Sequence, residues 1–348
     1  MECELNMMNI IVDAMGGDNA PQAIIEGCIE AINMQDGFKI TLVGKNEVIQ
    51  KILDKNEFNK DRIDIVNATE VIEGNDTPTK AIRNKKDSSM VVGLKLLKEK
   101  KGDAFISAGN TGALMTGALL LVGRIEGIDR PSLPALVPSK KGMTLIIDAG
   151  MNTVCRPINY LQFAIMGSIY MKLIYNNESP KIGLLNVGSE DAKGNDTLKH
   201  AFELLSTSPI NFVGNMEGND ITGGDVDVAV CDGYVGNVSL KLYEGVGSLL
   251  LKELKKLFTK NILTKVCYLM LNSAFKDFKS KFDPDELSGA PVLGINELVV
   301  KSHGSSKAKT IRTTILKRAI PLVQNGVVDE IKNQFKNMEV KPSDDDID

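Results

Sequence analysis

Five turns of this sequence combine glycine with small polar residues, a composition that suits the binding of an anion. They are DAMGGDNAP (13–21), SAGNTGA (107–113), DAGMN (148–152), NVGSEDAKGND (186–196) and CDGYVGNVSLK (231–241). Glycine lets a phosphate come close to the backbone N–H groups, and Asn or Thr adds a side-chain donor. A tight bend without a ligand explains any single turn equally well. Five such turns favour an anionic ligand.

Other familiar chemical signatures are missing from the sequence. It has no GxxxxGK[ST] phosphate loop, no GxGxxG fingerprint, no GxSxG elbow, no HExxH and no CxxC, which removes the main support for nucleotide-binding, serine-hydrolase and zinc-protease functions. The five cysteines are scattered and predict neither disulfides nor a metal site. We therefore expect a reduced, cytoplasmic protein without metal or cofactor.

Charge and hydropathy exclude two further classes of protein. The net charge of -4 gives no general basic field for nucleic acid. The first residues, MECELNMMNI, lack the pattern of an export signal, and no apolar run approaches the length of a spanning helix. We expect neither nucleic-acid binding nor an integral membrane protein.

The turns follow short apolar runs that alternate with helical patterns, which predicts a largely parallel sheet covered on both faces. We expect strands at Asn9–Asp13, Phe38–Val43, Ile63–Val66, Ala104–Ser107, Leu145–Asp148, Ile182–Leu185, Val226–Cys231 and Leu298–Lys301. We expect helices at Pro21–Asn33, Ser88–Lys100, Asn159–Tyr175, Thr197–Ser206 and Asn237–Phe258. Without a linker or repeat, residues 1–340 are predicted to form one interlocked α/β domain, and residues 341–348 a disordered acidic tail. In such a sheet ligands bind beyond the carboxyl ends of the strands, where the five turns lie.

The turns and their flanking segments together resemble the phosphate acyltransferase (PlsX) family of phospholipid synthesis. The similar segments include SAGNTGALMTGA, RPINYLQFAIMG, KIGLLNVGSEDAKGN, DVAVCDGYVGNVSLKLYEG and GAPVLGINELVVKSHGSS, and they run in order from about residue 10 to residue 311. The resemblance implies a three-layer α/β/α fold with a mixed, mostly parallel sheet, related to isocitrate dehydrogenases and phosphotransacetylases. It also implies a homodimer that reversibly transfers a fatty acyl group from acyl carrier protein to inorganic phosphate. The acyl phosphate would then pass to a membrane glycerol-3-phosphate acyltransferase.

Three other functions remain open beside this one. A phosphotransacetylase-like enzyme would share the fold and the reaction type but would use acyl-coenzyme A. A non-catalytic scaffold that docks lipid enzymes at the membrane would need no anion pocket, so the dense chemistry of the turns argues against it. A dehydrogenase of the related fold is a further alternative.

For acyl transfer to phosphate we expect positioning to carry most of the catalysis, since phosphate is already a nucleophile and a thioester is already activated. We assign catalysis to Lys193 as the leading cation, His303 as proton donor to the departing thiolate, Asn237 and Asp232. We assign phosphate or substrate binding to Asp13, Gly16, Gly17, Asn110, Thr111 and Gly112. Asp13 and Asp232 either orient Lys193 or His303 or cap turns. Asn237 caps the helix that it opens, contacts ligand, or does both. His303 is expected to precede a helix opened by Ser305 and Ser306.

Residues 247–282 predict a basic amphipathic helical segment. Its apolar stripe and its row of lysines suit a dimer-packing helix with a solvated face, and suit equally well a helix that lies on an anionic membrane or meets the acidic carrier protein. We assign membrane or carrier-protein contact to Leu254, Lys255, Lys256, Leu257 and Phe258. Peripheral association with the inner face of the membrane would follow.

Overall fold

The computed structural model describes residues 7–336, which cluster into two compact units. The first unit holds the described residues up to Ser132, residues 172–177 and the described residues from Gly289 onward. The second holds Leu133–Met171 and Glu178–Ser288. Each unit is therefore built from separate stretches of the chain. The predicted acidic tail, 341–348, lies outside the described residues.

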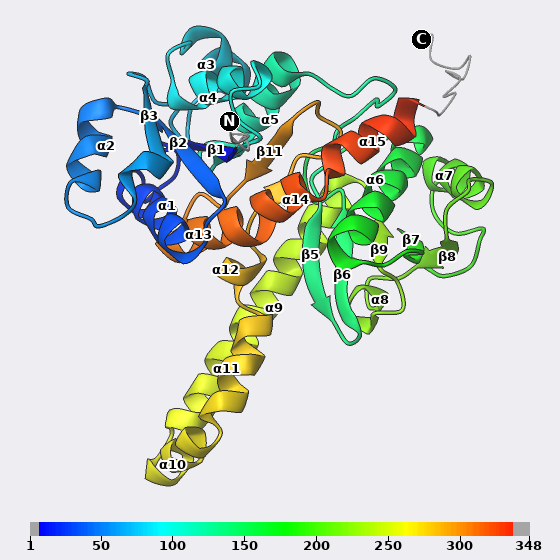
Figure 1. Ribbon diagram of the computed structural model, residues 1–348. Helices are drawn as coiled ribbons and strands as arrows, with labels where there is room; N and C mark the ends of the chain where they lie inside the picture. The colour runs from blue at the N-terminus through cyan, green and yellow to red at the C-terminus, as the bar shows by residue number, and fades with distance from the viewer. Residues whose placement is uncertain (1–6, 337–348) are drawn as a thin grey trace, which may run out of the picture. The chain divides into compact units, whose positions relative to one another are not determined.

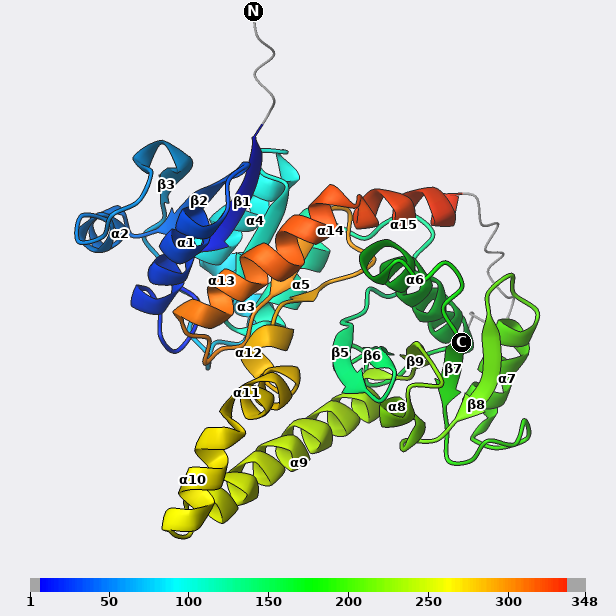
Figure 2. The same cartoon turned by 60° about the horizontal axis from the view of Figure 1, so that its bottom comes forward.

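The first unit is built on a six-stranded sheet with the order β10-β11-β4-β1-β2-β3 (Figures 1 and 2). The strands are β1 (Met8–Asp13), β2 (Phe38–Gly44), β3 (Ile63–Asn67), β4 (Ala104–Ser107), β10 (Ala290–Pro291) and β11 (Leu298–Lys301). All pairs are parallel except β10 with β11. The parallel strands therefore place their carboxyl ends along one edge of the sheet.

Helices cover both faces of this sheet, which explains why β1 and β4 are apolar and buried along almost their whole length. The helices are α1 (Gln22–Met34), α2 (Asn46–Leu53), α3 (Pro78–Asn84), α4 (Ser89–Lys98), α5 (Thr111–Gly117), α13 (Ala308–Thr314), α14 (Ile320–Gln324) and α15 (Val327–Lys336). α4 packs on β1, β2 and β4, whereas α1 packs on β2 and against α13. α4 begins at a Ser88 cap, whose hydroxyl accepts the N–H of Val91.

The second unit is built on a five-stranded sheet with the order β5-β6-β9-β7-β8. Its strands are β5 (Ala135–Ser139), β6 (Gly142–Ile147), β7 (Ile182–Leu185), β8 (Phe212–Met216) and β9 (Val228–Val230), and only the β5–β6 pair is antiparallel. Its helices are α6 (Pro157–Tyr175, ending among residues of the first unit), α7 (Asp196–Ser206), α8 (Asp220–Gly223), α9 (Gly233–Thr259), α10 (Ile262–Met270), α11 (Asn272–Lys281) and α12 (Pro284–Leu287). The sequence predicted one sheet, and the structure divides its strands between two.

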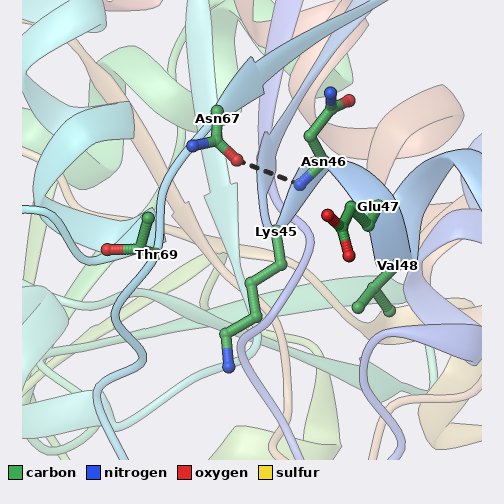
Figure 3. Close-up of a pocket in the computed structure, with 6 residues that line it drawn as sticks. All are labelled: Lys45, Asn46, Glu47, Val48, Asn67 and Thr69. Atoms are coloured by element: carbon green, nitrogen blue, oxygen red, sulfur yellow. Dashed lines mark hydrogen bonds between the residues drawn. The ribbon is translucent and has the colours of Figure 1, made fainter.

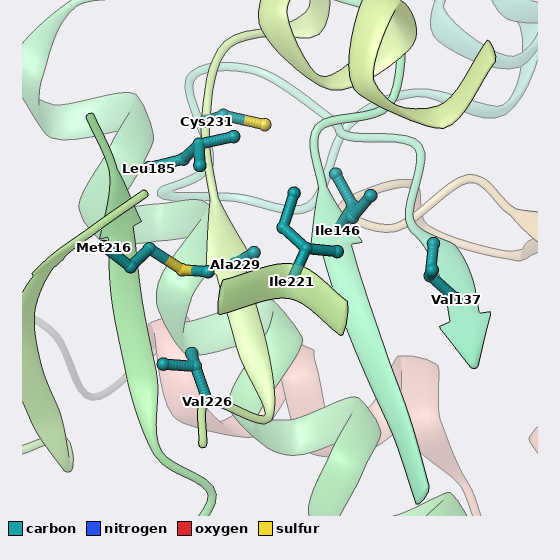
Figure 4. Packing of buried hydrophobic residues seen from close by; sticks show 8 residues of the cluster. All are labelled: Val137, Ile146, Leu185, Met216, Ile221, Val226, Ala229 and Cys231. Carbon is teal, nitrogen blue, oxygen red and sulfur yellow. The ribbon is translucent and has the colours of Figure 1, made fainter. Parts of the chain in front are cut away.

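One face of this second sheet carries an apolar cluster (Figure 4). Its members are Val137, Ile146, Leu185, Met216, Ile221, Val226, Ala229 and Cys231, with Leu240 and Tyr243 of α9 packed against them. α6 packs closely on the sheet at Gly167, where an added Cβ would lie 2.7 Å from Cγ1 of Val228. No helix among residues 7–336 combines the length and the apolar character that crossing a bilayer requires.

Candidate functional site

In the first unit, three turns meet at the carboxyl ends of β1, β4 and β11. The N–H of Asp18 donates to the carbonyl of Gly304 at 2.8 Å, and Nδ2 of Asn19 donates to the carbonyl of Ser305 at 3.0 Å. The turn after β1 also touches the turn after β4, because a Cβ at Gly16 would lie 2.9 Å from the N atom of Gly109. The structure thus brings together the predicted residues Gly16, Gly17 and His303 with the start of the 107–113 turn.

The buried carboxylate of Asp13 connects two of these turns. Asp13 is 1% exposed; its Oδ2 accepts from the hydroxyl of Ser107 at 2.7 Å and its Oδ1 from the N–H of Met15 at 3.2 Å. The same Ser107 hydroxyl accepts the N–H of Gly109 at 3.0 Å. Burial raises the pKa of Asp13, and hydrogen bonds from Ser89 and Ser107 lower it only partly. Asp13 therefore links the β1 turn to the β4 turn.

Asn110 acts as a brace for the neighbouring loop. Its Oδ1 caps α5 by accepting the N–H of Ala113 at 2.9 Å, while its Nδ2 donates to the carbonyls of Glu73, Gly74 and Asp76. Both ends of the side chain are thus occupied by backbone partners. Any contribution of this turn to anion binding comes more easily from its backbone than from the Asn110 amide.

Thr111 and Gly112 form the first turn of α5. Thr111 is exposed, and Gly112 packs so closely that an added Cβ would lie 2.6 Å from Cγ of Pro78. Within residues 7–336, the backbone N–H groups of Gly17, Thr111 and Gly304 donate no hydrogen bond to protein. They come from the three turns that meet at this edge. Unpaired N–H groups in such a position are donors for an anion.

His303 lies in the third turn and is exposed. Ser305 engages the ring at Nδ1 through its hydroxyl, at 2.8 Å, and through its N–H, at 3.2 Å. Nε2 has no partner among the described residues. The helix expected to open at Ser305 and Ser306 begins later, at Ala308, because Ser306 is buried and hydrogen-bonds to Ser302 at 2.9 Å.

In the second unit, the turn after β6 is organised by Asp148, a residue that the sequence analysis did not single out. Its carboxylate is fully buried, and among residues 7–336 it accepts hydrogen bonds only from nitrogen donors, on Leu133, Gly150, Met151 and Asn152, at 2.7–3.2 Å. Burial raises the pKa of Asp148, and these donors offset the shift only in part. The sequence signal for this role of Asp148 was its position at the end of a predicted strand, directly before a glycine turn.

Asp13→Asn and Asp148→Asn are expected to differ sharply. At position 148 the new amide would point N–H groups at N–H donors, so we expect a loss of about 2–3 kcal/mol in the free energy of unfolding. At position 13 the Ser107 hydroxyl can turn to accept from the new amide, so the loss should stay near 1 kcal/mol or below, on the order of one hydrogen bond. Urea unfolding of both variants measures the difference, and equal losses would contradict the donor argument.

The pH dependence gives a second measurement on Asp13. Burial keeps the folded pKa of Asp13 above its ordinary value of 3.8, so the folded protein binds the proton more tightly than the unfolded chain. The contribution of Asp13 to stability is therefore full below pH 3.8 and is lost as pH rises through the folded pKa. Asp13→Asn removes this pH-dependent loss. The difference in free energy of unfolding between variant and wild type should therefore shift in favour of the variant as the pH rises from acidic to neutral.

Asp232 and Asn237 lie at the start of α9. Asp232 is the N-cap, and its Oδ1 accepts the N–H of Val235 at 2.9 Å. The helix begins at Gly233, four residues before Asn237, so Asn237 does not cap it. Asn237 instead packs on the β6 turn, where a Cβ at Gly150 would lie 3.2 Å from its Nδ2.

Lys193 belongs to the turn after β7. Its ammonium lies 3.9 Å from a carboxylate oxygen of Glu190, and its side chain is 49% exposed. Its carbonyl accepts from Nδ2 of Asn186 at 3.1 Å, which ties the turn to the end of β7. A half-exposed cation with one long ion pair can engage a further anion.

The basic segment 247–282 is a set of helices rather than one continuous helix. α9 ends at Thr259, and Asn261 caps α10 by accepting the N–H of Thr264. Of the residues assigned to membrane or carrier contact, Lys255 and Lys256 are exposed and Leu257 is 59% exposed. Leu254 and Phe258 are half-buried, and the Phe258 ring meets that of Phe275 edge-on at 4.5 Å between centroids.

Comparison with known proteins matches almost the whole chain. A family model described as "Fatty acid synthesis protein" matches residues 8–330. A relative from Acetivibrio thermocellus named "Phosphate acyltransferase" is 57% identical over 340 residues, covering 98% of this chain and 100% of the relative. A relative of the same name from Thermoanaerobacter pseudethanolicus is 48% identical over 331 residues, covering 95% of this chain and 98% of the relative.

Solved structures with a similar fold include two phosphotransacetylases. The one from Streptococcus pyogenes has a TM-score of 0.60 at 16% identity. The matched region covers 91% of this chain and 94% of the Streptococcus chain. The EutD phosphotransacetylase from Staphylococcus aureus has a TM-score of 0.57 at 13% identity, with the same two coverages. This likeness shows a shared fold, as predicted.

Proposed function

Because the chain belongs to the phosphate acyltransferase family, we propose that it transfers a fatty acyl group from the thioester of acyl carrier protein to inorganic phosphate. The product is an acyl phosphate, which a membrane glycerol-3-phosphate acyltransferase would consume in phospholipid synthesis. One observation carries the proposal: three turns held together by hydrogen bonds present the unpaired N–H groups of Gly17, Thr111 and Gly304. Such a group of donors suits phosphate.

In this reaction a phosphate oxygen attacks the thioester carbonyl carbon, the new C–O bond forms, and the C–S bond breaks from the tetrahedral intermediate. The sulfur leaves as a thiolate and takes up a proton. We assign that proton to Nε2 of His303, because Ser305 occupies Nδ1 and orients the ring, and the proton that the attacking hydrogen phosphate loses restores the histidine. Lys193 remains the proposed phosphate cation on the second unit, and Asp232 and Asn237 remain proposed catalytic residues of that unit.

Detection of the product tests the function directly. Purified protein mixed with long-chain acyl carrier protein and phosphate should form acyl phosphate, identified by mass spectrometry. Acyl-coenzyme A at the same concentration is the matched comparison. Preference for the carrier thioester supports the proposal, preference for acyl-coenzyme A supports the phosphotransacetylase-like alternative, and no acyl phosphate from either donor would refute both.

His303→Ala is expected to lower kcat/KM for a carrier thioester by about 10- to 100-fold, the cost of one hydrogen bond to a developing charge. An acyl thiophenyl ester releases a thiolate that needs no proton, so the loss should largely vanish with that donor. His200→Ala is the control, since His200 is exposed on α7. Equal losses with both thioesters would exclude His303 as the proton donor.

We also propose that α9 joins a second copy of the chain. Its exposed apolar side chains recur at helical spacing: Val235, Val238, Leu242, Val246 and Leu249. A stripe at intervals of three and four residues runs along one helix face and pairs well with an identical face. Sedimentation equilibrium that finds a dimer would support this.

The end of the helical segment supports docking on a membrane or on the carrier protein. Ile262 and Met270 of α10 are each 82% exposed, and Lys255 and Lys256 lie nearby in the last turns of α9. Apolar side chains beside lysines are typical of an interfacial surface.

Charge reversal at Lys255 and Lys256 is expected to weaken binding to anionic vesicles about 10- to 30-fold, on the basis of about 1 kcal/mol per lysine. Reversal of Lys95 and Lys98 of α4, which are exposed on the first unit, makes the same change in net charge and is the control. Unchanged affinity for both vesicles and acyl carrier protein would reject the assignment.

A further inference from the structure

A cavity at the carboxyl ends of β2 and β3 has no role in the function described so far. It has a volume of about 490 Å³ and is lined by Lys45, Asn46, Glu47, Val48, Asn67 and Thr69 (Figure 3). Lys45 follows the last residue of β2, and Gly44 pairs with Asn67 across the two parallel strands. The cavity therefore opens at the same sheet edge as the three turns that hold the unpaired N–H groups.

The chemistry of the lining suits a polar ligand that carries both an anion and amide groups. Lys45 is exposed, and its ammonium has no partner among the described residues. Asn67 uses its Oδ1 to accept the N–H of Asn46 at 3.1 Å, which leaves its NH2 group without a partner in the described structure. The Glu47 carboxylate can accept from amide N–H groups. The lining therefore provides a cation, amide donors and hydrogen-bond acceptors, and not a positive charge alone.

The cavity lies within reach of the candidate phosphate site. β2 neighbours β1, so the cavity between β2 and β3 is about 5–10 Å from the end of β1, on the basis of roughly 4.8 Å between adjacent strands. Met15 lies between them, since an added Cβ at Gly44 would lie 2.7 Å from Cγ of Met15. Met15 directly precedes Gly16, so a ligand that passes over its flexible thioether side chain has one end in the cavity and the other at the turns.

We propose that this cavity holds the phosphopantetheine arm of the acyl donor, with Lys45 at its phosphate and Asn67 and Glu47 at its amides. The proposal rests on the function proposed above, because that arm carries the reacting thioester. Its chemistry is shared by acyl carrier protein and by coenzyme A. The arm is longer than this distance when extended, so it would reach the turns in a bent conformation, with the thioester at the phosphate and the arm's own phosphate at Lys45.

The test compares Lys45→Ala with wild type on three donors: acyl carrier protein, acyl-coenzyme A and acyl-pantetheine, which lacks the phosphate. Loss of one hydrogen bond to a charged phosphate should raise KM for the first two about tenfold. KM for acyl-pantetheine, KM for inorganic phosphate and kcat should not change. Lys51→Ala is the control, because Lys51 is exposed on α2, the helix that Lys45 precedes, but does not line the cavity.

A rise in KM with both phosphate-bearing donors would support the proposal, whereas a rise with acyl carrier protein alone would place Lys45 against the carrier protein instead of the arm and would overturn it. No rise with either, or an equal rise with acyl-pantetheine, would overturn the proposal. Calorimetry with free phosphopantetheine and with pantetheine gives a readout that does not depend on turnover. If wild type makes no acyl phosphate but Lys45→Ala abolishes phosphopantetheine binding, the cavity assignment stands and the acyl transfer fails.

Discussion

Gly236→Ala is expected to lower the free energy of unfolding by about 3–5 kcal/mol, since it overpacks a rigid site. An added Cβ would lie 1.9 Å from the carbonyl oxygen of Asp148 and 2.9 Å from Sγ of Cys231. The carbonyl belongs to the buried turn that the Asp148 carboxylate organises. Gly236 itself lies in the first turns of α9, held by the Asp232 cap. Neither backbone can retreat without breaking these hydrogen bonds.

Gly245→Ala is the matched control on the same helix, because an added Cβ there meets no atom within 4 Å. Alanine is the better helix former by about 1 kcal/mol, so this variant should be slightly more stable than wild type. Urea unfolding followed by circular dichroism measures both. If the two variants behave alike, close approach of α9 to the Asp148 turn is not what requires glycine at position 236.

Gly16→Ala should lower the rate of acyl phosphate formation by about 100-fold or more, the usual consequence of displacing a reacting group by about 1 Å. The new Cβ would lie 2.4 Å from Oδ2 of Asp13 and 2.9 Å from the N atom of Gly109. It therefore drives the turn after β1 away from the turn after β4. The N–H groups of Gly17 and Thr111, which lie on those two turns, can then no longer engage one phosphate together.

The control for this variant is Gly74→Ala, in the loop that Asn110 braces, where an added Cβ has no atom within 4 Å. Its Asn110 contact is to the backbone carbonyl and survives the substitution. Turnover and urea unfolding should be measured on both proteins. A Gly16→Ala enzyme that stays folded and retains wild-type turnover would show that the phosphate binds elsewhere.

Local sequence pattern determined the secondary structure closely in the buried strands. Ala104–Ser107, Ile182–Leu185 and Leu298–Lys301 were predicted at the observed bounds, because a short, mostly apolar run between turns has few alternatives. The antiparallel strand β5 and the strand β8 were missed. Proline in one, and glycine and asparagine in the other, mask the apolar pattern.

The start of a helix was harder to predict from the sequence where glycine has a packing role. The two glycines of CDGYVGN favoured a loop up to Asn237, yet the helix begins at Gly233. An added Cβ at Gly233 would lie 2.7 Å from the N atom of Asn152, a contact between segments far apart in the chain. Only the packed structure shows that glycine there serves close approach rather than flexibility.

The sequence by itself determined the alternation of strands and helices, the turns that follow the strands, and the family. The tertiary structure decided which turns meet, how the strands divide between two sheets, and which polar side chains are already in use. Asn110, whose amide is occupied by three carbonyls, and Asp148, whose carboxylate is surrounded by nitrogen donors, show the difference. The physical reason is that strand and helix patterns arise from neighbours along the chain, whereas the partners of a polar group come from residues that only folding brings within hydrogen-bonding distance.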